Sequence, residues 1–420
     1  MSRAGAASRL GACLALLVTA ALVSAAPGEA PLVPLQPLVD ATPPGGTLVP
    51  PPGRYAGPVV LRHPIVLDGK GQVSIDAGGS GSVVRILTEH AVVRGLHLQG
   101  SGANPDHLDA GVQVRGSHNR IEDNVIEDCL FGVDLKQVDD NLIRGNRIRS
   151  KPFSLGERGD GIRLWYSNHN RILDNRVSRV RDLVVWYSLS NVFERNHVED
   201  SRYGLHFMYA HHNQVRENVF THDRVGIFLM YSDGLVVSGN RIVGASGPTG
   251  LGIGVKESSS ITASGNAIAY CARGIYLDVS PYDPETTNTF SGNRIAYNGM
   301  GIVFHNDWHG NVFVGNALEG NFAQVTVDDD SSANRNRWRG NYWSDYRGFD
   351  RNRDEQGDAP YELYDYADKI WIELPEAAFF RGSPVLELID FLDHLAPFSE
   401  PTLVLRDPSP RMNAAAATAS

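Results

Sequence analysis

Four stretches of thirteen residues follow one another along the chain: RLWYSNHNRILDN (163–175), VVWYSLSNVFERN (184–196), HFMYAHHNQVREN (206–218) and FLMYSDGLVVSGN (228–240). Their first residues are 21, 22 and 22 positions apart. A fixed period in this range is typical of proteins built from stacked repeats, in which each repeat contacts only its neighbours. The four stretches therefore predict a solenoid.

Asparagines recur at two fixed places in this repeat. One closes the repeat, at Asn124, Asn146, Asn175, Asn196, Asn218, Asn240, Asn266, Asn293, Asn316 and Asn341. Another usually stands five residues earlier, at Asn119, Asn141, Asn170, Asn191, Asn213, Asn288, Asn311 and Asn336. Asparagine tolerates left-handed backbone angles, and its amide can bond to the matching residue one turn away. The two series therefore predict asparagine ladders along the corners of a coil.

Short apolar segments opened by glycine run between these asparagines, as in GVQV (111–114), GVDL (132–135), GIRL (161–164), GIFL (226–229), GIYL (274–277) and GIVF (301–304). Each alternates with period two, which indicates a strand, and each is too short for a helix. A repeat of about 22 residues with two or three short strands predicts an all-β fold, a right-handed parallel β-helix over residues 59–345. A propeller or a sandwich, the alternatives, would need hairpin turns and longer strands.

The segments outside the solenoid are assigned from their composition. Residues 1–26 contain Arg3 and Arg9, an apolar run and small residues near Ala26, which together are typical of a cleavable signal peptide. A lipoprotein signal at Cys13 is the alternative, but most of the apolar run follows that residue. We expect an N-terminal cap at 27–58, a C-terminal cap at 346–400 with a short amphipathic helix at 384–398, and a loose tail at 401–420.

The charge of the chain bears on its partners and location. Lys and Arg number 38 and Asp and Glu 48, and removal of residues 1–26 takes away two arginines and no acids, leaving 36 − 48 = −12. A nucleic-acid-binding protein normally carries the opposite sign, so we expect no nucleic-acid partner. Export by a signal peptide predicts a periplasmic protein.

The repeat also decides how the two later cysteines are used. Cys129 and Cys271 each stand three residues before a strand-opening glycine, and six turns separate those glycines. At about 4.8 Å per turn the two residues would be roughly 29 Å apart. A disulfide needs Cα atoms within about 7 Å, so both are predicted to be free thiols.

Alternation along the strands predicts which side chains face outward. In G-I-x-L the Ile and Leu point inward, so x and the residue after Leu point out. The first outward column reads Asp134, Arg163, Val184, His206, Phe228, Gly254, Tyr276 and Val303, and the second Lys136, Trp165, Trp186, Met208, Met230, Lys256, Asp278 and His305. We call Trp165, Trp186, Met208, Met230 and Phe228 the apolar ridge, which charged residues such as Lys256 and Asp278 border. Outward apolar patches usually mark docking surfaces, although a loop could cover this one.

The ridge also offers soft metal ligands. Met208 and Met230 occupy the same position on adjacent turns, about 5 Å apart, and His206 lies on the same strand face. Thioether and imidazole groups suit Cu(I). A second candidate copper site is Met300, His305 and His309. Both sets could equally be ordinary surface residues, because no tight His-x-His or Cys-x-x-Cys spacing is present.

A carboxylate-rich turn near the end of the solenoid is a candidate calcium site. Asp350, Asn352, Asp354 and Asp358 place oxygen ligands at loop positions 1, 3, 5 and 9, the spacing of an EF-hand loop. Glu355 stands where that motif has glycine, and Tyr361 where it has a bidentate glutamate. A solvated acidic turn is therefore the alternative to calcium binding.

Several stretches resemble the NosD family of periplasmic β-helical proteins in nitrous oxide reductase maturation. The matching stretches are GIFLMYSDG (226–234), LGIGVKESSS (251–260), YCARGIYLDVSPYDP (270–284), GIVFHNDWHGNVFVGN (301–316), RWRGNYWSDYRGFDRNRD (337–354) and YADKIW (366–371). The resemblance covers nearly the whole chain after the signal peptide. The repeat pattern alone is shared with many carbohydrate-active β-helices, whereas the stretch from 270 to 371 is much more specific.

The resemblance implies a maturation factor that is not an enzyme. Proteins of the NosD family act with an ABC-type ATPase and a membrane permease, NosF and NosY, so this chain would be peripheral to the membrane through the permease. They are implicated in building the copper–sulfide centre of nitrous oxide reductase, with copper supplied through the chaperone NosL. The implied partners are thus NosF, NosY, NosL and the apo-reductase.

A periplasmic polysaccharide lyase or epimerase that uses the outer groove is the alternative function. General acid–base catalysis needs two ionisable groups close to one substrate bond. The centre of the outer face offers Trp and Met side chains and no paired carboxylates. Asp106, His107 and Asp109 in one loop are the best catalytic candidates. Because docking requires an apolar stripe with a charged border, the sequence favours a docking protein.

Overall fold

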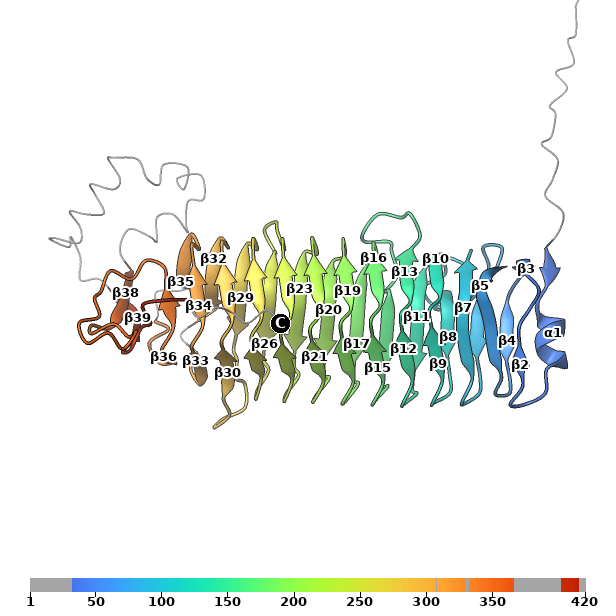
Figure 1. The fold of residues 1–420 in the computed structure, drawn as a ribbon, viewed down its shortest axis with the longest axis horizontal. Coiled ribbons are helices and arrows are strands. Elements are labelled where there is room, and N and C mark those ends of the chain that lie inside the picture. The colour runs from blue at the N-terminus through green and yellow to red at the C-terminus, as the bar shows by residue number, and fades with distance from the viewer. Residues whose placement is uncertain (1–31, 307, 329–331, 366–401, 415–420) are drawn as a thin grey trace, which may run out of the picture. The chain divides into compact units, whose positions relative to one another are not determined.

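The computed structural model of this chain describes residues 32–306, 308–328, 332–365 and 402–414. Within these ranges the chain coils into a parallel β-helix, which confirms the predicted fold class (Figure 1). One complete turn consists of β20 (Tyr203–Met208), β21 (Gln214–Arg216) and β22 (Val219–Thr221). The predicted signal peptide and the predicted helix at 384–398 lie outside the described residues.

The first strand of each turn belongs to one 12-stranded parallel sheet. Its members are β4 (Val59–Leu61), β6 (Val84–Ile86), β8 (Ala110–Val114), β11 (Phe131–Lys136), β14 (Ile162–Trp165), β17 (Asp182–Trp186), β20, β23 (Val225–Met230), β26 (Leu251–Lys256), β29 (Arg273–Asp278), β32 (Met300–Phe304) and β35 (Ala323–Val327). Each of these strands pairs with its counterpart one turn away, so sequence neighbours are never paired within this sheet.

The second and third strands of each turn form two further parallel ladders. The second ladder comprises β9 (Arg120–Glu122), β12 (Leu142–Arg144), β15 (Arg171–Leu173), β18 (Val192–Glu194), β21, β24 (Val236–Ser238), β27 (Thr262–Ser264), β30 (Asn288–Ser291), β33 (Asn311–Val314) and β36 (Arg337–Arg339). The third comprises β10 (Val125–Cys129), β13 (Arg147–Ser150), β16 (Arg176–Ser178), β19 (His197–Glu199), β22, β25 (Arg241–Val243), β28 (Ala267–Ala269), β31 (Arg294–Ala296), β34 (Ala317–Glu319) and β37 (Tyr342–Trp343).

The asparagine ladders predicted from the repeat are present and buried. The side-chain oxygen of Asn218 accepts the backbone N–H of Asn196 at 2.9 Å, and its amide donates to the carbonyl of Phe193 at 2.9 Å. Asn240 does the same for the next turn, bonding to Asn218 at 2.9 Å. Each side chain therefore satisfies corner N–H and C=O groups that the strands leave unpaired, a necessity where backbone is shielded from water.

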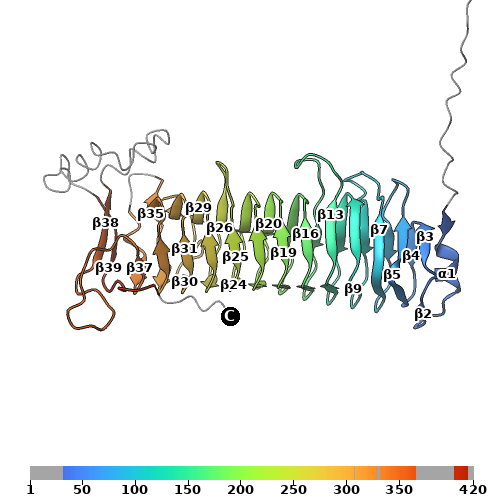
Figure 2. The same cartoon turned by 45° about the horizontal axis from the view of Figure 1, so that its top comes forward.

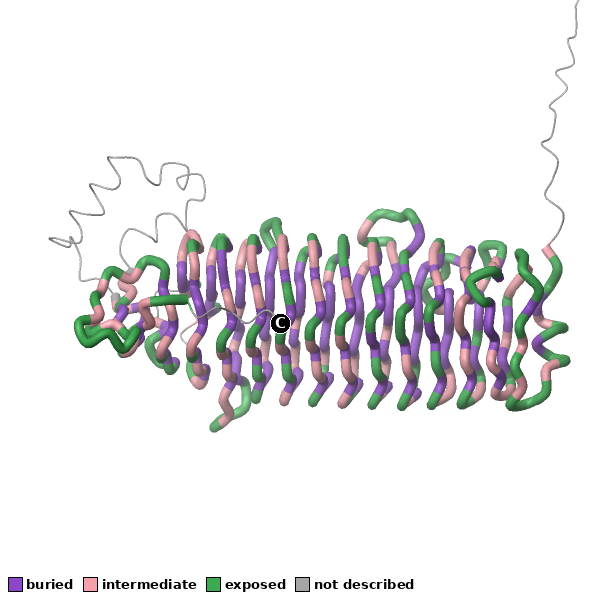
Figure 3. Tube along the Cα trace, in the orientation of Figure 1, coloured by how far each residue is buried: buried purple, intermediate pink, exposed green. Residues whose placement is uncertain are grey.

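Apolar side chains from all three ladders fill the interior. Ile227 and Leu229 point inward and are fully buried, as the alternation predicts. Buried segments recur at the same places in successive turns (Figure 3). The strand-opening glycines are needed for close packing, since a Cβ atom on Gly226 would lie 2.6 Å from the Cγ2 atom of Ile242.

Both cysteines in the described residues are buried free thiols, which confirms the prediction. Burial raises the pKa of Cys129 to about 12 and that of Cys271 to about 11. A thiol with such a pKa is almost entirely protonated at neutral pH and is a poor nucleophile and metal ligand. The two cysteines therefore act as small apolar residues of the interior.

Other elements stand at the two ends of the solenoid. Before the first turns come β1 (Val33–Pro34), helix α1 (Gln36–Ala41), β2 (Thr47–Leu48), β3 (Gly53–Ala56), β5 (Val66–Asp76) and later β7 (Val92–Gln99). At the other end β38 (Tyr361–Asp365) pairs antiparallel with β39 (Thr402–Asp407) (Figure 2). The predicted loose tail at 401–420 is thus wrong for residues 402–407, because their side chains complete the end of the interior.

Asp407 closes one asparagine ladder. It is fully buried, and its carboxylate accepts the backbone N–H of Asn341 at 3.0 Å and the side-chain amide of Asn341 at 2.9 Å. It also accepts the N–H of Gly340 at 3.2 Å and the indole N–H of Trp343 at 3.3 Å. The carboxylate occupies the position of the next asparagine and satisfies the donors that the last turn would otherwise leave unpaired.

Replacement of this carboxylate tests its role at the end of the solenoid. Asp407→Ala leaves several buried N–H groups without an acceptor, so we expect the free energy of unfolding to fall by roughly 3–5 kcal/mol. Urea unfolding measures the change. Glu362→Ala is the control, because Glu362 on the paired strand makes surface contacts, an ion pair with Arg406 at 3.4 Å and a hydrogen bond from the Tyr364 hydroxyl at 3.0 Å, and exposed pairs of this kind contribute less than about 1 kcal/mol each. Equal effects of the two substitutions would contradict the assignment.

Candidate functional site

The apolar ridge lies on the outer face of the 12-stranded sheet, in the predicted register. Trp165, Trp186, Met208 and Met230 are consecutive Cα partners from β14 to β23. Phe228 stands in the adjacent column, after His206. All five ridge residues are half-buried, and the rings of Trp165 and Trp186 contact each other with centroids 5.6 Å apart. The ridge is therefore a continuous packed surface.

His206 lies at the centre of this surface, in contact with one ridge methionine. Its Nε2 atom is 3.3 Å from the Sδ atom of Met230. The residue is 7% exposed, and its Nδ1 atom has no hydrogen-bond partner among the described residues. Met208 is the Cα partner of Met230 on the neighbouring strand. The structure thus brings one imidazole and two thioether side chains together.

Aromatic rings surround the imidazole of His206. Tyr203 stacks on it with ring centroids 4.7 Å apart, and Trp186 meets it perpendicularly at 5.9 Å. Phe228 lies 6.2 Å away. Burial among these rings lowers the pKa of His206 to about 4. The imidazole is therefore neutral at pH 7, the form that binds metals.

A ladder of tyrosines runs beside the ridge, at the end of these strands. The rings of Tyr166, Tyr187, Tyr209 and Tyr231 stack in sequence at 4.8, 5.3 and 4.9 Å. Tyr166 and Tyr209 are 49% and 43% exposed. The sequence contains a signal for this ladder, because a tyrosine stands at the same place in all four repeats. The predicted site residues do not include these tyrosines. Tyrosine is enriched at binding hot spots, so this ladder widens the candidate docking surface.

Ion pairs border the ridge at both ends. Beyond Met230, the Nζ atom of Lys256 is 2.5 Å from the Oδ2 atom of Asp278. Before Trp165, the carboxylate of Asp134 is fully buried between two guanidinium groups, with Arg163 at 3.0 Å. The guanidinium of Arg163 also lies 4.8 Å from the ring centroid of Trp165. The predicted charged border is therefore present and is made of paired charges.

Two further carboxylates lie under arginines near the ridge. Asp160 is 2.8 Å from the Nη2 atom of Arg181, and Asp182 is 2.9 Å from the Nε atom of Arg202. Burial raises the pKa of Asp160 to about 6. The two acids are only 2% and 1% exposed, so a polymer on the outer face could not reach them. The predicted site residues do not include Asp160 and Asp182, because both precede the two outward columns in the repeat.

The loop with Asp106, His107 and Asp109 does not form a catalytic pair. Asp109 is buried, and its Oδ2 atom accepts the backbone N–H of Asn104 at 2.9 Å. Asp106 and His107 are exposed. The carboxylate of Asp109 therefore holds the loop together.

The second candidate copper site is not assembled. Met300 begins β32 and His305 follows its last residue, which places their Cα atoms roughly 16 Å apart. The Nδ1 atom of His309 accepts a hydrogen bond from Arg335 at 3.2 Å. Strand geometry therefore separates Met300 from His305, although the two are close in sequence.

Carboxylates of the candidate calcium loop accept hydrogen bonds from the backbone of the same loop. Both oxygens of Asp350 accept backbone N–H groups, including those of Arg353 at 2.6 Å and Glu355 at 2.9 Å. Glu355 has φ of +66°, at the position where an EF-hand loop has glycine. In the described ranges, no group of three or more His, Cys, Asp and Glu residues could hold a metal ion. Calcium binding here stays a prediction, which a calcium titration of the full chain would check.

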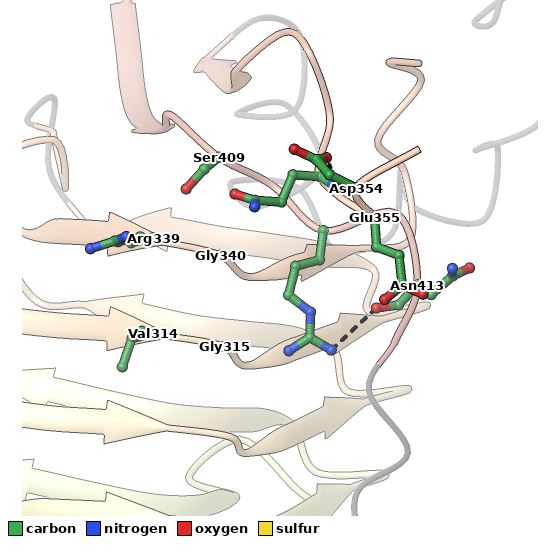
Figure 4. A pocket seen from close by; sticks show the side chains of 10 residues that line it. Val314, Gly315, Arg339, Gly340, Asp354, Glu355, Ser409 and Asn413 are labelled. Carbon is green, nitrogen blue, oxygen red and sulfur yellow. Dashed lines mark hydrogen bonds between the residues drawn. The ribbon is translucent and has the colours of Figure 1, made fainter. Parts of the chain in front are cut away.

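A pocket of about 350 Å³ adjoins this loop (Figure 4). Its charged lining residues are Arg339 of β36, Asp354, Glu355 and Arg411. The guanidinium of Arg411 donates to the backbone carbonyl of Asn413 at 3.3 Å. None of the ridge residues contributes to this pocket, so the two features are separate.

Comparison with known proteins identifies the family. A family model described as periplasmic copper-binding protein (NosD) matches residues 145–348. A Pseudomonas aeruginosa (strain PAO1) protein named probable ABC transporter binding protein NosD is 32% identical, over 86% of this chain and 85% of that protein. One of the same name from Stutzerimonas stutzeri is 29% identical, over 93% and 91%. This chain therefore belongs to the NosD family, a family of periplasmic proteins.

Solved structures with a similar fold are also found. A PL6 alginate lyase in complex with a trisaccharide matches with a TM-score of 0.48 and 15% identity, over 71% of this chain and 84% of that one. Likeness at this level says nothing about activity. In the part of the chain that the structure describes, no helix has the length and apolar character to cross a membrane.

The lowered pKa of His206 predicts how this residue titrates. Its ordinary value is 6.5 and its value in the fold is about 4, so its imidazole should stay neutral between about pH 5 and pH 8. NMR of the histidine-labelled protein, with His206→Phe for assignment, measures this. A His206 signal that titrates near pH 6.5 would contradict the prediction.

The same shift has a consequence for stability. Between about pH 4 and pH 6.5 the unfolded chain binds more protons at this histidine than the folded chain does. Above pH 6.5 this difference does not lower the free energy of unfolding. As the pH falls from 6.5 towards 4, the difference lowers the free energy of unfolding progressively. The raised pKa of Asp160 changes the free energy of unfolding with pH in the opposite direction. Because Asp160 is present in the wild type and in His206→Phe, its effect cancels when the two proteins are compared.

Proposed function

We propose that this chain is a periplasmic accessory protein for the copper–sulfide centre of nitrous oxide reductase, working with the ABC transporter formed by NosF and NosY. Membership of the NosD family supports a role in the Nos system, and its relatives are named ABC transporter binding proteins. In this proposal the chain takes up copper transiently as cargo and docks the chaperone NosL or the apo-reductase. It performs no catalysis.

The contact between His206 and Met230 carries the proposal. The imidazole and thioether are 3.3 Å apart, close enough for both to bind one metal ion, and Met208 stands two residues after His206 on the same strand, as the Cα partner of Met230. These soft donors suit Cu(I). The buried Nδ1 atom of His206 has no partner in the described chain, so no hydrogen bond competes with a ligand at that nitrogen. The copper-binding description of the family agrees with this donor set.

The apolar ridge and the tyrosine ladder serve as the docking surface in this proposal. Trp and Tyr are the residue types most enriched where binding energy concentrates in protein interfaces. The border pair Lys256–Asp278 and the arginines near Trp165 give such a surface charged ends, which favour one orientation of a partner. Docking at this surface would bring the partner beside His206 and the two methionines.

The alternative function, a polysaccharide lyase or epimerase, has less support. General acid–base catalysis requires ionisable groups within reach of a substrate bond. Asp134, Asp160 and Asp182 are buried and paired with arginines, and His206 is enclosed by aromatic rings. Depolymerisation of alginate or pectin by the purified protein would overturn the proposed function.

Titration with Cu(I) under anaerobic conditions tests the copper site. We expect the wild-type chain to bind one Cu(I) in competition with a chromophoric chelator. Met230→Leu keeps the volume but removes the thioether, and should lower the affinity at least about tenfold, as should Met208→Leu. Met300→Leu is the control, because Met300 lies outside the ridge. Unchanged affinity in both ridge variants would refute this site while leaving docking intact.

Binding of purified NosL and apo-reductase to immobilised protein tests the docking surface. Tyr209→Ala truncates an exposed ring of the tyrosine ladder and should weaken the complex at least about tenfold, the effect expected at a hot spot. Tyr270→Ala is a matched control: Tyr270 is also exposed, stacks on Tyr297, and lies at another corner of the coil. If both variants bind as the wild type does, the tyrosine ladder is not part of the docking surface.

A further inference from the structure

We propose that Gly254 positions the pair of His206 and Met230 by giving the ring of Phe228 a place to lie. This inference rests on the proposed function, because the positioned pair is the copper site. It assigns a role to a glycine that touches neither His206 nor the cargo. Gly254 is thus a positioning residue for the site.

His206, Phe228 and Gly254 are consecutive members of one outward column. Phe228 is the Cα partner of His206 on one side and of Gly254 on the other. A Cβ atom on Gly254 would lie 2.3 Å from the Cδ2 atom of Phe228 and 2.5 Å from its Cε2 atom. No real Cβ contact is this short, so the aromatic ring occupies the space that a side chain on Gly254 would need.

The backbone does not explain a glycine at this position. Gly254 lies within strand β26 and is not among the glycines with positive φ. A glycine inside a strand weakens it, and usually marks a place where another group approaches the backbone closely. Here that group is the ring of Phe228. Residue 254 is therefore glycine because a side chain at this position would have no space.

The position of the Phe228 ring determines the direction in which the side chain of His206 can point. Because its ring lies over the β26 strand, it does not stand between His206 and Met230. The imidazole of His206 can then cross from β20 to the Sδ atom of Met230 at 3.3 Å. The Phe228 ring is parallel to that of Tyr203 at 6.0 Å, and His206 is inclined to it by only 24°. Displacing Phe228 towards β20 would disturb this whole arrangement.

Gly254→Ala tests the proposal in the full chain. The added methyl group should push the Phe228 ring back towards His206, shift the His206 NMR signals of the metal-free protein, and lower the Cu(I) affinity at least about tenfold. Phe228→Leu in the Gly254→Ala background removes the clash, so the His206 signals and the Cu(I) affinity of this double variant should match those of Phe228→Leu alone. Phe228→Leu alone removes a ring that lies 6.2 Å from His206 and so changes the His206 signals itself; it is therefore the reference for the double variant. Alanine is no worse than glycine for the backbone of a strand, so any loss of stability in Gly254→Ala comes from the contact with the Phe228 ring.

The outcomes separate this inference from the proposed function. If Gly254→Ala leaves the His206 signals and the Cu(I) affinity unchanged, the positioning role is refuted and the copper site stands. If the wild type binds no Cu(I) but the His206 signals shift in Gly254→Ala while those of the double variant match Phe228→Leu alone, the copper site fails and the positioning role stands. Should Gly254→Ala not fold, Phe228→Trp replaces it, because its larger ring overfills the same space; unshifted His206 signals would then refute the role.

Discussion

The structure depends on one repeated interaction, the bond from a buried asparagine side chain to the backbone of the neighbouring turn. A coil of short strands turns three corners in every repeat, and each corner removes N–H and C=O groups from the strand ladders. Asn196, Asn218 and Asn240 satisfy those groups with side-chain amides at about the length of a backbone hydrogen bond. Since unpaired buried backbone is costly, the ladder fixes where each turn begins and how successive turns align.

The alignment of turns is what creates the candidate site. Residues about 22 positions apart become Cα partners, so Trp186, Met208 and Met230 form a column although no local motif joins them. His206 reaches Met230 diagonally between two such columns. A solenoid can therefore assemble metal donors and a docking surface from separate repeats, each of which supplies one or two side chains on a rigid strand. The same regularity makes Gly254 a partner of Phe228 and gives a single missing side chain a role in the site.

Predictions from the sequence succeeded where the repeat governs structure. The strand positions, the asparagine ladders, the buried free thiols and both outward columns follow from period and alternation, and the structure has them in that register. Predictions failed where residues close in sequence were grouped without regard to strand geometry, as for Met300 and His305. They also failed at the end of the repeat, where Asp407 takes the place of an asparagine from a segment with no repeat pattern.

The sequence by itself determined the fold, the register and the family resemblance, because a solenoid is a one-dimensional stack whose contacts are set by a fixed spacing. Only the tertiary structure decided how the outward side chains pack. Alternation places His206 and Phe228 on the outer face, but does not show that rings enclose the imidazole, or that Phe228 lies on Gly254. Those features depend on side-chain direction and on neighbours in three dimensions, and the period of the sequence contains no information about either.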